Sequence, residues 1–178
     1  MLEQDIKKVS VSKEELELMN KRLGNEISND YNGKCPMFVG LLKGCLPFLS
    51  DLLKNVTIPC TVDYFKVSSY NGAQSTGIIK IKGECPDVDG KDVIVVDDIL
   101  DTGKTLKAVK ELLIANGAKS VKICVLLDKP EGRKENINAD YVGGNVPNEF
   151  VVGYGLDYND LYRNIPYVGV LKDEIYKN

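Results

Sequence analysis

Apolar residues recur with helical spacing in three segments of the chain. The first segment follows Ser12-Lys13-Glu14-Glu15, a capping box that marks a helix N-terminus, and its apolar face comprises Leu16, Met19, Leu23 and Ile27. The second begins at Pro47, because proline is favoured in the first turn of a helix. The third follows a Thr-Gly-Lys-Thr turn and ends at Gly117, which suits the position just beyond a helix C-terminus. Each pattern predicts a helix with one buried face.

Apolar runs predict three buried strands, and two segments that mix β-formers with polar residues predict two more strands. The predicted strands are Met37 to Leu42, Thr61 to Val67, Ile78 to Ile81, residues 93–97, and Val121 to Leu127. The strand, helix and strand between residues 93 and 127 form a βαβ unit, which joins parallel strands. We therefore expect an α/β fold, in which one domain over residues 1–178 has a mainly parallel twisted sheet flanked by helices. Ligands of such sheets bind at the carboxyl ends of the strands.

Composition and charge exclude several classes of protein. With 178 residues, of which 43% are apolar, the chain is long enough to bury a core and is not disordered. Its net charge of −3 and scattered Lys and Arg residues argue against a nucleic-acid binder. No apolar run approaches the roughly 20 residues of a membrane helix. The acidic N-terminus has no signal-peptide core, so we expect a cytoplasmic protein with no nucleic-acid or membrane partner.

The cysteine and histidine content narrows the chemistry. Five cysteines without a Cys-x-x-Cys pair are typical of reduced thiols in the cytosol. The chain has no histidine, which excludes a Ser-His or Cys-His nucleophile pair and the common zinc sites. Proton transfer near neutral pH must then use a carboxylate, a lysine, a tyrosine, a thiol or the substrate itself.

The segment from Val93 to Leu106 contains the highest density of candidate ligand-binding and catalytic residues. A β-branched apolar run ends at Asp97 and Asp98, and Asp101 and the Thr-Gly-Lys-Thr turn follow. This pattern predicts a buried strand, an acidic loop and a helix N-terminus. Backbone N–H groups there can hold an anion, and the carboxylates can hold a polyol or a metal ion. Simple capping of the helix by Asp101 or Thr102 is the alternative.

The same turn resembles the end of a nucleotide-binding P-loop, but counting excludes that motif. A P-loop needs a glycine five positions before its second glycine, and Asp98 stands there. A carboxylate at this position would repel the phosphates that a P-loop cradles. The turn is therefore expected to hold a single phosphate, with the carboxylates facing hydroxyl groups or Mg²⁺.

Residues Val95 to Leu106 resemble the loop that binds phosphoribosyl diphosphate (PRPP) in type I phosphoribosyltransferases. Four more segments follow the family's order and point to its 6-oxopurine branch: Leu41–Gly44, Ser68–Gly77, Leu126–Pro130, and Phe150–Asn159 with Arg163. The resemblance implies the type I phosphoribosyltransferase fold, with a hood from the N-terminal segment and about 130–178 over the strand ends. It also implies a homodimer or homotetramer that transfers 5-phosphoribosyl from PRPP to N9 of hypoxanthine or guanine. The products would be IMP or GMP and pyrophosphate, in purine salvage.

The resemblance assigns the ribose and the phosphates of PRPP to different residues. Asp97 and Asp98 would bind the ribose hydroxyls, and with Asp157 they would hold the Mg²⁺ cofactor. The family usually has Glu and then Asp at this pair, so Asp97 reaches one methylene less far. Pyrophosphate would be held by Lys43, Gly44 and Arg163, and the 5-phosphate by Asp101, Thr102, Gly103, Lys104 and Thr105.

The purine is assigned to a second group of residues. Lys129 would donate to O6 of the base, and Phe150 would stack on its ring. Backbone carbonyls near Val151 and Asp157 would accept from N1–H and from a 2-amino group. Asp101 would act as general acid and base at N7, which raises the electron density at N9.

A lid over the site is implied for residues 68–77, which include Ser69 and Tyr70. The segment is rich in Ser, Gly, Asn and Gln, as mobile loops are. Because the transition state should resemble an oxocarbenium ion, closure of the lid would protect it from water.

Two other functions remain open at this point. A PRPP- or nucleotide-sensing regulator of the same fold would usually carry an added DNA-binding domain or a degraded site, and the sequence displays neither. A phosphoribosyltransferase for adenine, orotate or uracil fits less well, because adenine presents a donor amine where Lys129 needs an acceptor. The sequence does not rank hypoxanthine, guanine and xanthine.

Overall fold

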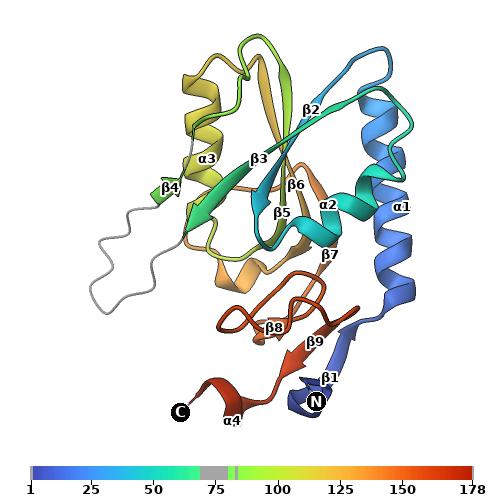
Figure 1. The fold of residues 1–178 in the computed structure, drawn as a ribbon, viewed down its shortest axis with the longest axis vertical. Helices are drawn as coiled ribbons and strands as arrows, with labels where there is room; N and C mark the ends of the chain where they lie inside the picture. The colour runs from blue at the N-terminus through green and yellow to red at the C-terminus, as the bar shows by residue number, and fades with distance from the viewer. Residues whose placement is uncertain (1, 69–79, 83, 178) are drawn as a thin grey trace.

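The computed structural model describes residues 2–68, 80–82 and 84–177. Its main body is a six-stranded sheet with the order β4-β3-β2-β5-β6-β7 (Figure 1). The strands are β2 (Met37–Leu42), β3 (Thr61–Ser68), β4 (Lys80–Lys82), β5 (Asp92–Leu100), β6 (Ser120–Asp128) and β7 (Tyr141–Asn145). Neighbours from β3 to β7 pair in parallel, and β4 runs antiparallel to β3. The predicted α/β class with a mainly parallel sheet is confirmed.

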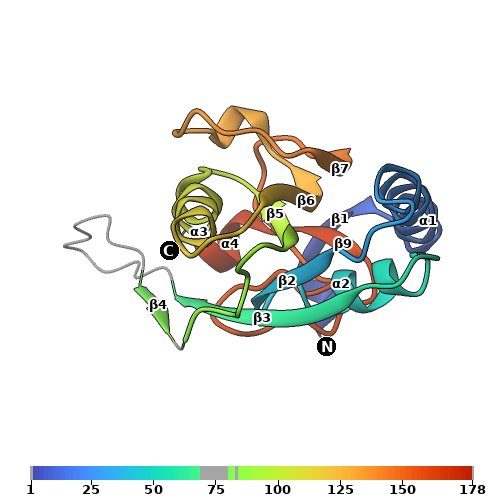
Figure 2. The same cartoon turned by 90° about the horizontal axis from the view of Figure 1, so that it is seen from above.

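Three helices cover the two faces of this sheet, and they are α1 (Lys13–Asp30), α2 (Leu46–Leu53) and α3 (Lys104–Ala115). Figure 2 shows α3 on one side of the sheet and α1 and α2 on the other. Successive side chains of a strand point to opposite faces, so each strand contributes to two cores. Along β5, Ile94 and Val96 pack with α1 and α2, whereas Val93 and Val95 pack with α3.

The helix ends follow the local signals in the sequence. Ser12 Oγ accepts from the N–H of Glu15, and Glu15 Oε2 accepts from the N–H of Ser12, which completes the capping box of α1. Pro47 lies in the first turn of α2. Gly117 follows the C-cap of α3 with a φ of 91°, a left-handed conformation that glycine adopts without steric cost.

A second, antiparallel sheet joins the two ends of the chain in the order β1-β9-β8. Figure 1 shows it below the main sheet, with both chain ends beside it. Its strands and the remaining short helices are β1 (Ile6–Val11), β8 (Val151–Val152), β9 (Val168–Leu171), η1 (Leu2–Asp5), η2 (Pro130–Gly132) and α4 (Asp173–Tyr176). None of these three strands is predicted from the sequence, since β8 has only two residues and half of the six residues of β1 are polar. The hood remains a prediction, and β7 within residues 130–178 belongs to the main sheet.

Strand β5 is longer than its apolar run predicts. Its parallel pairing with β6 continues until Leu100 lies opposite Asp128, and Leu100 is fully buried. The acidic pair therefore lies inside the strand, and the prediction of an acidic loop directly after residue 97 is wrong. Gly103 is the N-cap residue of α3, and Thr102 Oγ1, one residue earlier, accepts from the N–H of Lys104 at 3.5 Å.

Two other predictions fall partly on residues that are not described. The strand expected at 78–81 corresponds to β4, which begins at Lys80 and ends at Lys82. The lid residues Ser69 and Tyr70 lie outside the described residues. Within the described ranges, no helix is both long enough and apolar enough to cross a lipid bilayer.

Candidate active site

Three adjacent strands bring the predicted site residues to one edge of the main sheet. Strands β2, β5 and β6 are neighbours, and the segments that follow them begin at Lys43, Asp101 and Lys129. Two cavities of about 270 and 260 Å³ have linings that share Asp98, Ile99 and Asp101. We name them the turn cavity, lined by residues between 97 and 106, and the aromatic cavity, which includes Phe150. They are two halves of one site that meet at the end of β5.

The turn cavity is built from one stretch of chain at the N-terminus of α3. Gly103 has a φ of 82°, and a Cβ added to it would lie 2.6 Å from Ile137 Cγ2, so both the backbone and the available space require glycine. The first N–H groups of a helix have no acceptor within that helix and can bind an anion. Thr102 and Thr105 add hydroxyl groups to the lining, whereas Lys104 is exposed beside it.

Asp97 and Asp98 are half-buried and line the turn cavity, and Asp98 also lines the aromatic cavity. Burial raises the pKa of Asp97, and the negative charge of Asp98 raises it further. Burial also raises the pKa of Asp98, although a hydrogen bond with Asp97 and the positive charge of Arg163 oppose this rise. A cation or a hydroxyl donor bound here would therefore relieve the cost of burying two carboxylates. The Asp98 carboxylate rests on Gly44, where any added Cβ would overlap it.

Asp101 and Lys129 lie side by side in the lining of the aromatic cavity. Lys129 Nζ lies 3.7 Å from Asp101 Oδ2, and the lysine side chain is only 13% exposed. The Asp101 carboxylate rests on Gly132, where any added Cβ would overlap it. The site therefore presents a carboxylate and an ammonium group side by side, as an acceptor and a donor for one edge of a ligand.

Arg133 fixes the chain on both sides of this pair, and no sequence pattern singles it out. Its Nε donates to the backbone oxygen of Asp101 at 3.0 Å, and Nη1 donates to that of Ile137 at 2.6 Å. Nη2 forms an ion pair with Asp128, the last residue of β6. Arg133 therefore ties the ends of β5 and β6 together beneath the site.

The aromatic cavity takes its name from Phe150, whose ring is held by two tyrosines. Tyr176 of α4 stacks on it with ring centroids 4.8 Å apart and an angle of 26° between the planes. Tyr158 meets it edge to face, with centroids 5.6 Å apart. Val151 and Asp157 also line the cavity, together with Lys129. A flat ring could lie against the part of Phe150 that the tyrosines leave open.

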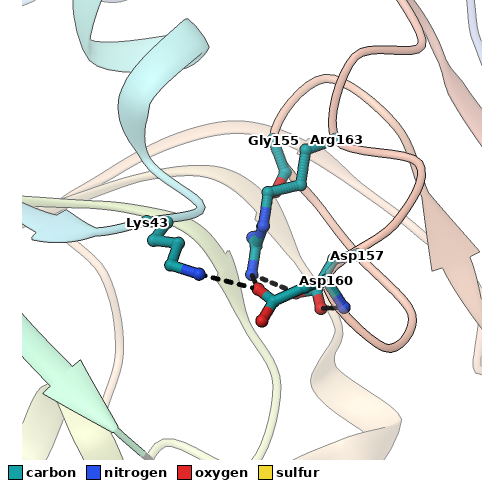
Figure 3. A network of polar contacts seen from close by, with 5 residues as sticks. All are labelled: Lys43, Gly155, Asp157, Asp160 and Arg163. Atoms are coloured by element: carbon teal, nitrogen blue, oxygen red, sulfur yellow. Dashed lines mark hydrogen bonds and ion pairs between the residues drawn. The ribbon is translucent and has the colours of Figure 1, made fainter.

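Lys43, Gly44 and Arg163 lie together at the other end of the site. The loop at Gly44 touches Gly155, where any added Cβ would overlap the Gly44 oxygen. The peptide bond between Leu42 and Lys43 is cis. Figure 3 shows the ion-pair network that joins these loops. Arg163 pairs with Asp157 at 2.7 Å and with Asp160 at 3.2 Å, and Asp160 also pairs with Lys43 at 3.0 Å.

The three predicted metal ligands do not form a ready-made cage. In the part of the chain that is described, no three or more His, Cys, Asp or Glu residues are grouped closely enough to hold a metal ion. Asp157 is engaged with Arg163, while Asp97 and Asp98 line the turn cavity. Mg²⁺ is usually held by one or two carboxylates, water and substrate phosphates, so this donor set fits an ion that arrives with its substrate.

Comparison with known proteins agrees with this arrangement. Residues 12–159 match the model of the phosphoribosyl transferase domain family. The chain is 51% identical to a hypoxanthine-guanine phosphoribosyltransferase of Streptococcus pneumoniae, in an alignment of 180 residues that covers 100% of both chains. A crystal structure of a hypoxanthine phosphoribosyltransferase from Staphylococcus aureus superimposes with a TM-score of 0.94 at 46% identity, covering 99% of this chain and 97% of that one. A crystal structure of a hypoxanthine-guanine phosphoribosyltransferase from Bacillus anthracis superimposes with a TM-score of 0.86 at 37% identity, covering 94% of this chain and 98% of that one. The chain belongs to the phosphoribosyltransferase family, and within it to the hypoxanthine-guanine phosphoribosyltransferases.

Proposed function

We propose that this chain transfers 5-phosphoribosyl from PRPP to N9 of hypoxanthine or guanine, giving IMP or GMP and pyrophosphate in purine salvage. One observation carries the proposal: the turn cavity and the aromatic cavity meet at Asp98 and Asp101. The first offers carboxylates beside a helix N-terminus, and the second offers a lysine beside an aromatic ring. A sugar phosphate and a flat 6-oxopurine can therefore meet at the shared wall.

The turn cavity suits the phosphoribosyl part of PRPP. In this proposal, backbone N–H groups of residues 101–105 and the hydroxyls of Thr102 and Thr105 bind the 5-phosphate. Asp97 and Asp98 accept from the 2- and 3-hydroxyl groups of the ribose, and these donors compensate the buried carboxylates.

The aromatic cavity suits a 6-oxopurine. Lys129 donates to O6, while the base lies against Phe150 and the carbonyl of Val151 accepts from the opposite edge. O6 and N7 lie on one edge of the purine, and the ion pair between Lys129 and Asp101 offers a donor and an acceptor side by side. Adenine would present an amino group to Lys129, so two buried donors would lack acceptors.

Asp101 is the proposed catalytic residue. It accepts the proton from N7 while N9 attacks C1 of the ribose, and the bond from C1 to pyrophosphate breaks. C1 develops oxocarbenium character in this step, and nearby carboxylates stabilise such charge in other glycosyl transfers. Closure of residues 68–77, with Ser69 and Tyr70, would keep water away from this centre.

The proposal includes Mg²⁺ as cofactor. Asp97 and Asp98 would hold the ion with oxygens of PRPP, and Asp157 would join them after release from Arg163. When bound, the ion neutralises charge on the leaving pyrophosphate. Lys43, the backbone of Gly44 and Arg163 supply further positive charge and donors at that end.

The proposal also covers the cellular location and the oligomeric state of the protein. All five cysteines are free thiols, which supports a reducing, cytoplasmic environment. We further expect a homodimer or homotetramer, which light scattering of the purified protein would measure directly.

Nucleotide formation tests the function. The protein would be incubated with PRPP, Mg²⁺ and one base at a time, namely hypoxanthine, guanine, xanthine or adenine, and the nucleotides separated by chromatography. We expect IMP and GMP to form much faster than AMP. PRPP binding without nucleotide formation from any base would instead favour a sensing protein, and preferred use of adenine would refute the role of Lys129.

A further inference from the structure

We infer that Asp160 is a built-in competitor of pyrophosphate, whose carboxylate occupies the cationic site that the pyrophosphate of PRPP must enter. The inference rests on the proposed function, because it takes Lys43 and Arg163 as the pyrophosphate-binding cations. Asp160 has no part in the transfer reaction itself. Its role is to weaken the binding of pyrophosphate and so to favour release of the product.

Both cations already hold this carboxylate (Figure 3). Asp160 Oδ1 lies 3.0 Å from Lys43 Nζ and 3.2 Å from Arg163 Nη2, so one oxygen bridges them. Asp160 is an exposed aspartate paired with two cations, so its carboxylate is charged near neutral pH. A phosphate oxygen that approached both cations would meet this negative charge.

Both terminal nitrogens of Arg163 already face protein acceptors. Its Nη1 donates to the Gly155 oxygen at 2.6 Å, and its Nη2 faces both Asp157 and Asp160. Its Nε is buried and has no hydrogen-bond partner. A guanidinium normally grips phosphate through two parallel N–H bonds, so an incoming phosphate must displace a carboxylate to use Nη2.

Asp160 is the carboxylate that can leave. Its side chain is 67% exposed, whereas that of Asp157 is 31% exposed and also accepts from the backbone N–H of Asp160 at 2.9 Å. Asp160 has a φ of 62° and Asn159 one of 52°, a left-handed turn in which Asn and Asp are the favoured non-glycine residues. The backbone turn can therefore persist while the Asp160 side chain swings into solvent.

Asp160→Asn isolates the charge, because asparagine has the same size and tolerates the same left-handed backbone. Asp87→Asn is the matched control, since Asp87 also forms an exposed lysine pair, with Lys91 at 3.1 Å, outside both cavities. Calorimetry with Mg²⁺ and pyrophosphate would give the dissociation constants, and product inhibition of IMP synthesis would give an independent value.

We expect pyrophosphate to bind Asp160→Asn about fivefold more tightly than the parent, as expected for removing one unit charge about 4 Å away in a watery site. The gain should shrink at high salt, because the site is exposed. Asp160→Glu should stay near the parent, because it retains the charge, and Asp87→Asn should not change.

Equal or weaker pyrophosphate binding by Asp160→Asn would overturn the inference and would make Asp160 a residue that orients the two cations. If the parent still forms IMP in that case, the proposed function stands. If the parent neither forms IMP nor binds pyrophosphate, the proposed function fails and the inference fails with it.

Discussion

The turn cavity and the aromatic cavity are built in opposite ways. The turn cavity uses residues between 97 and 106, on a strand whose pairing continues to Leu100 and on the helix that follows. The aromatic cavity combines Asp98, Ile99 and Asp101 with Lys129, residues 149–151 and residues 156–157. A site made from one stretch of backbone keeps its lining residues adjacent in the sequence, although Arg133 and the backbone of Lys134 also hold the turn. A site assembled from separate loops depends on the side chains that hold those loops in place.

This difference predicts two kinds of mutational effect. Changes at the wall of the turn cavity should lower kcat, because its groups are fixed where bonds break and form. Changes in the aromatic cavity should mainly raise KM for the base, because its groups hold and select the purine. Four experiments test this division, in order of decreasing effect.

Removing Mg²⁺ should have the largest effect, because it acts on both halves of the site. Excess EDTA should abolish nucleotide formation, since PRPP would carry clustered phosphate charge with no cation to neutralise it. Added Mg²⁺ should restore the activity. The melting temperature without substrates should not change, because no described group of three or more potential ligands forms a metal site. Full activity in excess EDTA would contradict the metal role of Asp97 and Asp98.

Asp101→Asn should lower kcat about 10²–10⁴-fold, the usual contribution of a positioned general acid or base. The amide cannot accept the N7 proton, but it preserves the shape of the wall. PRPP should bind almost as before, because backbone N–H groups hold its 5-phosphate. Steady-state kinetics and calorimetry would separate the two quantities, with Asp87→Asn as a control for the lost charge. A kcat near that of the parent would move the acid–base role to another group.

The contrast between the two cavities also explains which parts of the site could be predicted from the sequence alone. The acidic pair, the Thr-Gly-Lys-Thr turn and the helix stripe are contiguous, so their periods and turn residues predict β5 and α3. The end of β5 could not be predicted in this way. Its extension to Leu100 depends on pairing with β6, a partner that lies more than twenty residues away in the chain.

The aromatic cavity is harder to predict from the sequence, because its parts are also brought together by contacts between distant segments. Nothing near Arg133 in the sequence indicates that it reaches the backbone of Asp101. Tyr176 is near the C-terminus of the chain, yet its ring lies on Phe150. Asp160 is an exposed loop carboxylate until the fold brings Lys43 beside it. Such contacts are set by tertiary packing, which local periodicity does not record.

Lys129→Gln should act mainly on the binding of the purine in the aromatic cavity, although Lys129 also pairs with Asp101. Exchange of the charged donor to O6 for a neutral amide donor should raise KM for hypoxanthine and guanine about tenfold, because a hydrogen bond to a charged group contributes roughly 1–1.5 kcal/mol more than a neutral one. Glutamine also supplies an acceptor, so the gap between these bases and adenine should narrow. The comparison is kcat/KM for the three bases at saturating PRPP. Ratios equal to those of the parent would mean that Lys129 does not select the base.

Tyr176→Leu should change the kinetic constants least of the four, and it gives the most specific test of the division between the two cavities. The tyrosine ring supports Phe150 from α4 at 4.8 Å, and an aromatic pair contributes about 0.5–1.5 kcal/mol beyond its buried area. Without this support we expect KM for hypoxanthine to rise about two- to tenfold, while kcat and KM for PRPP stay unchanged. Tyr176→Phe is the matched control, because it keeps the ring and loses only the hydroxyl that donates to Asp173. It should behave as the parent does. A lower kcat with an unchanged KM would mean that the Tyr176 ring supports the reaction step and not purine binding. The proposed division between the turn cavity and the aromatic cavity would then be wrong.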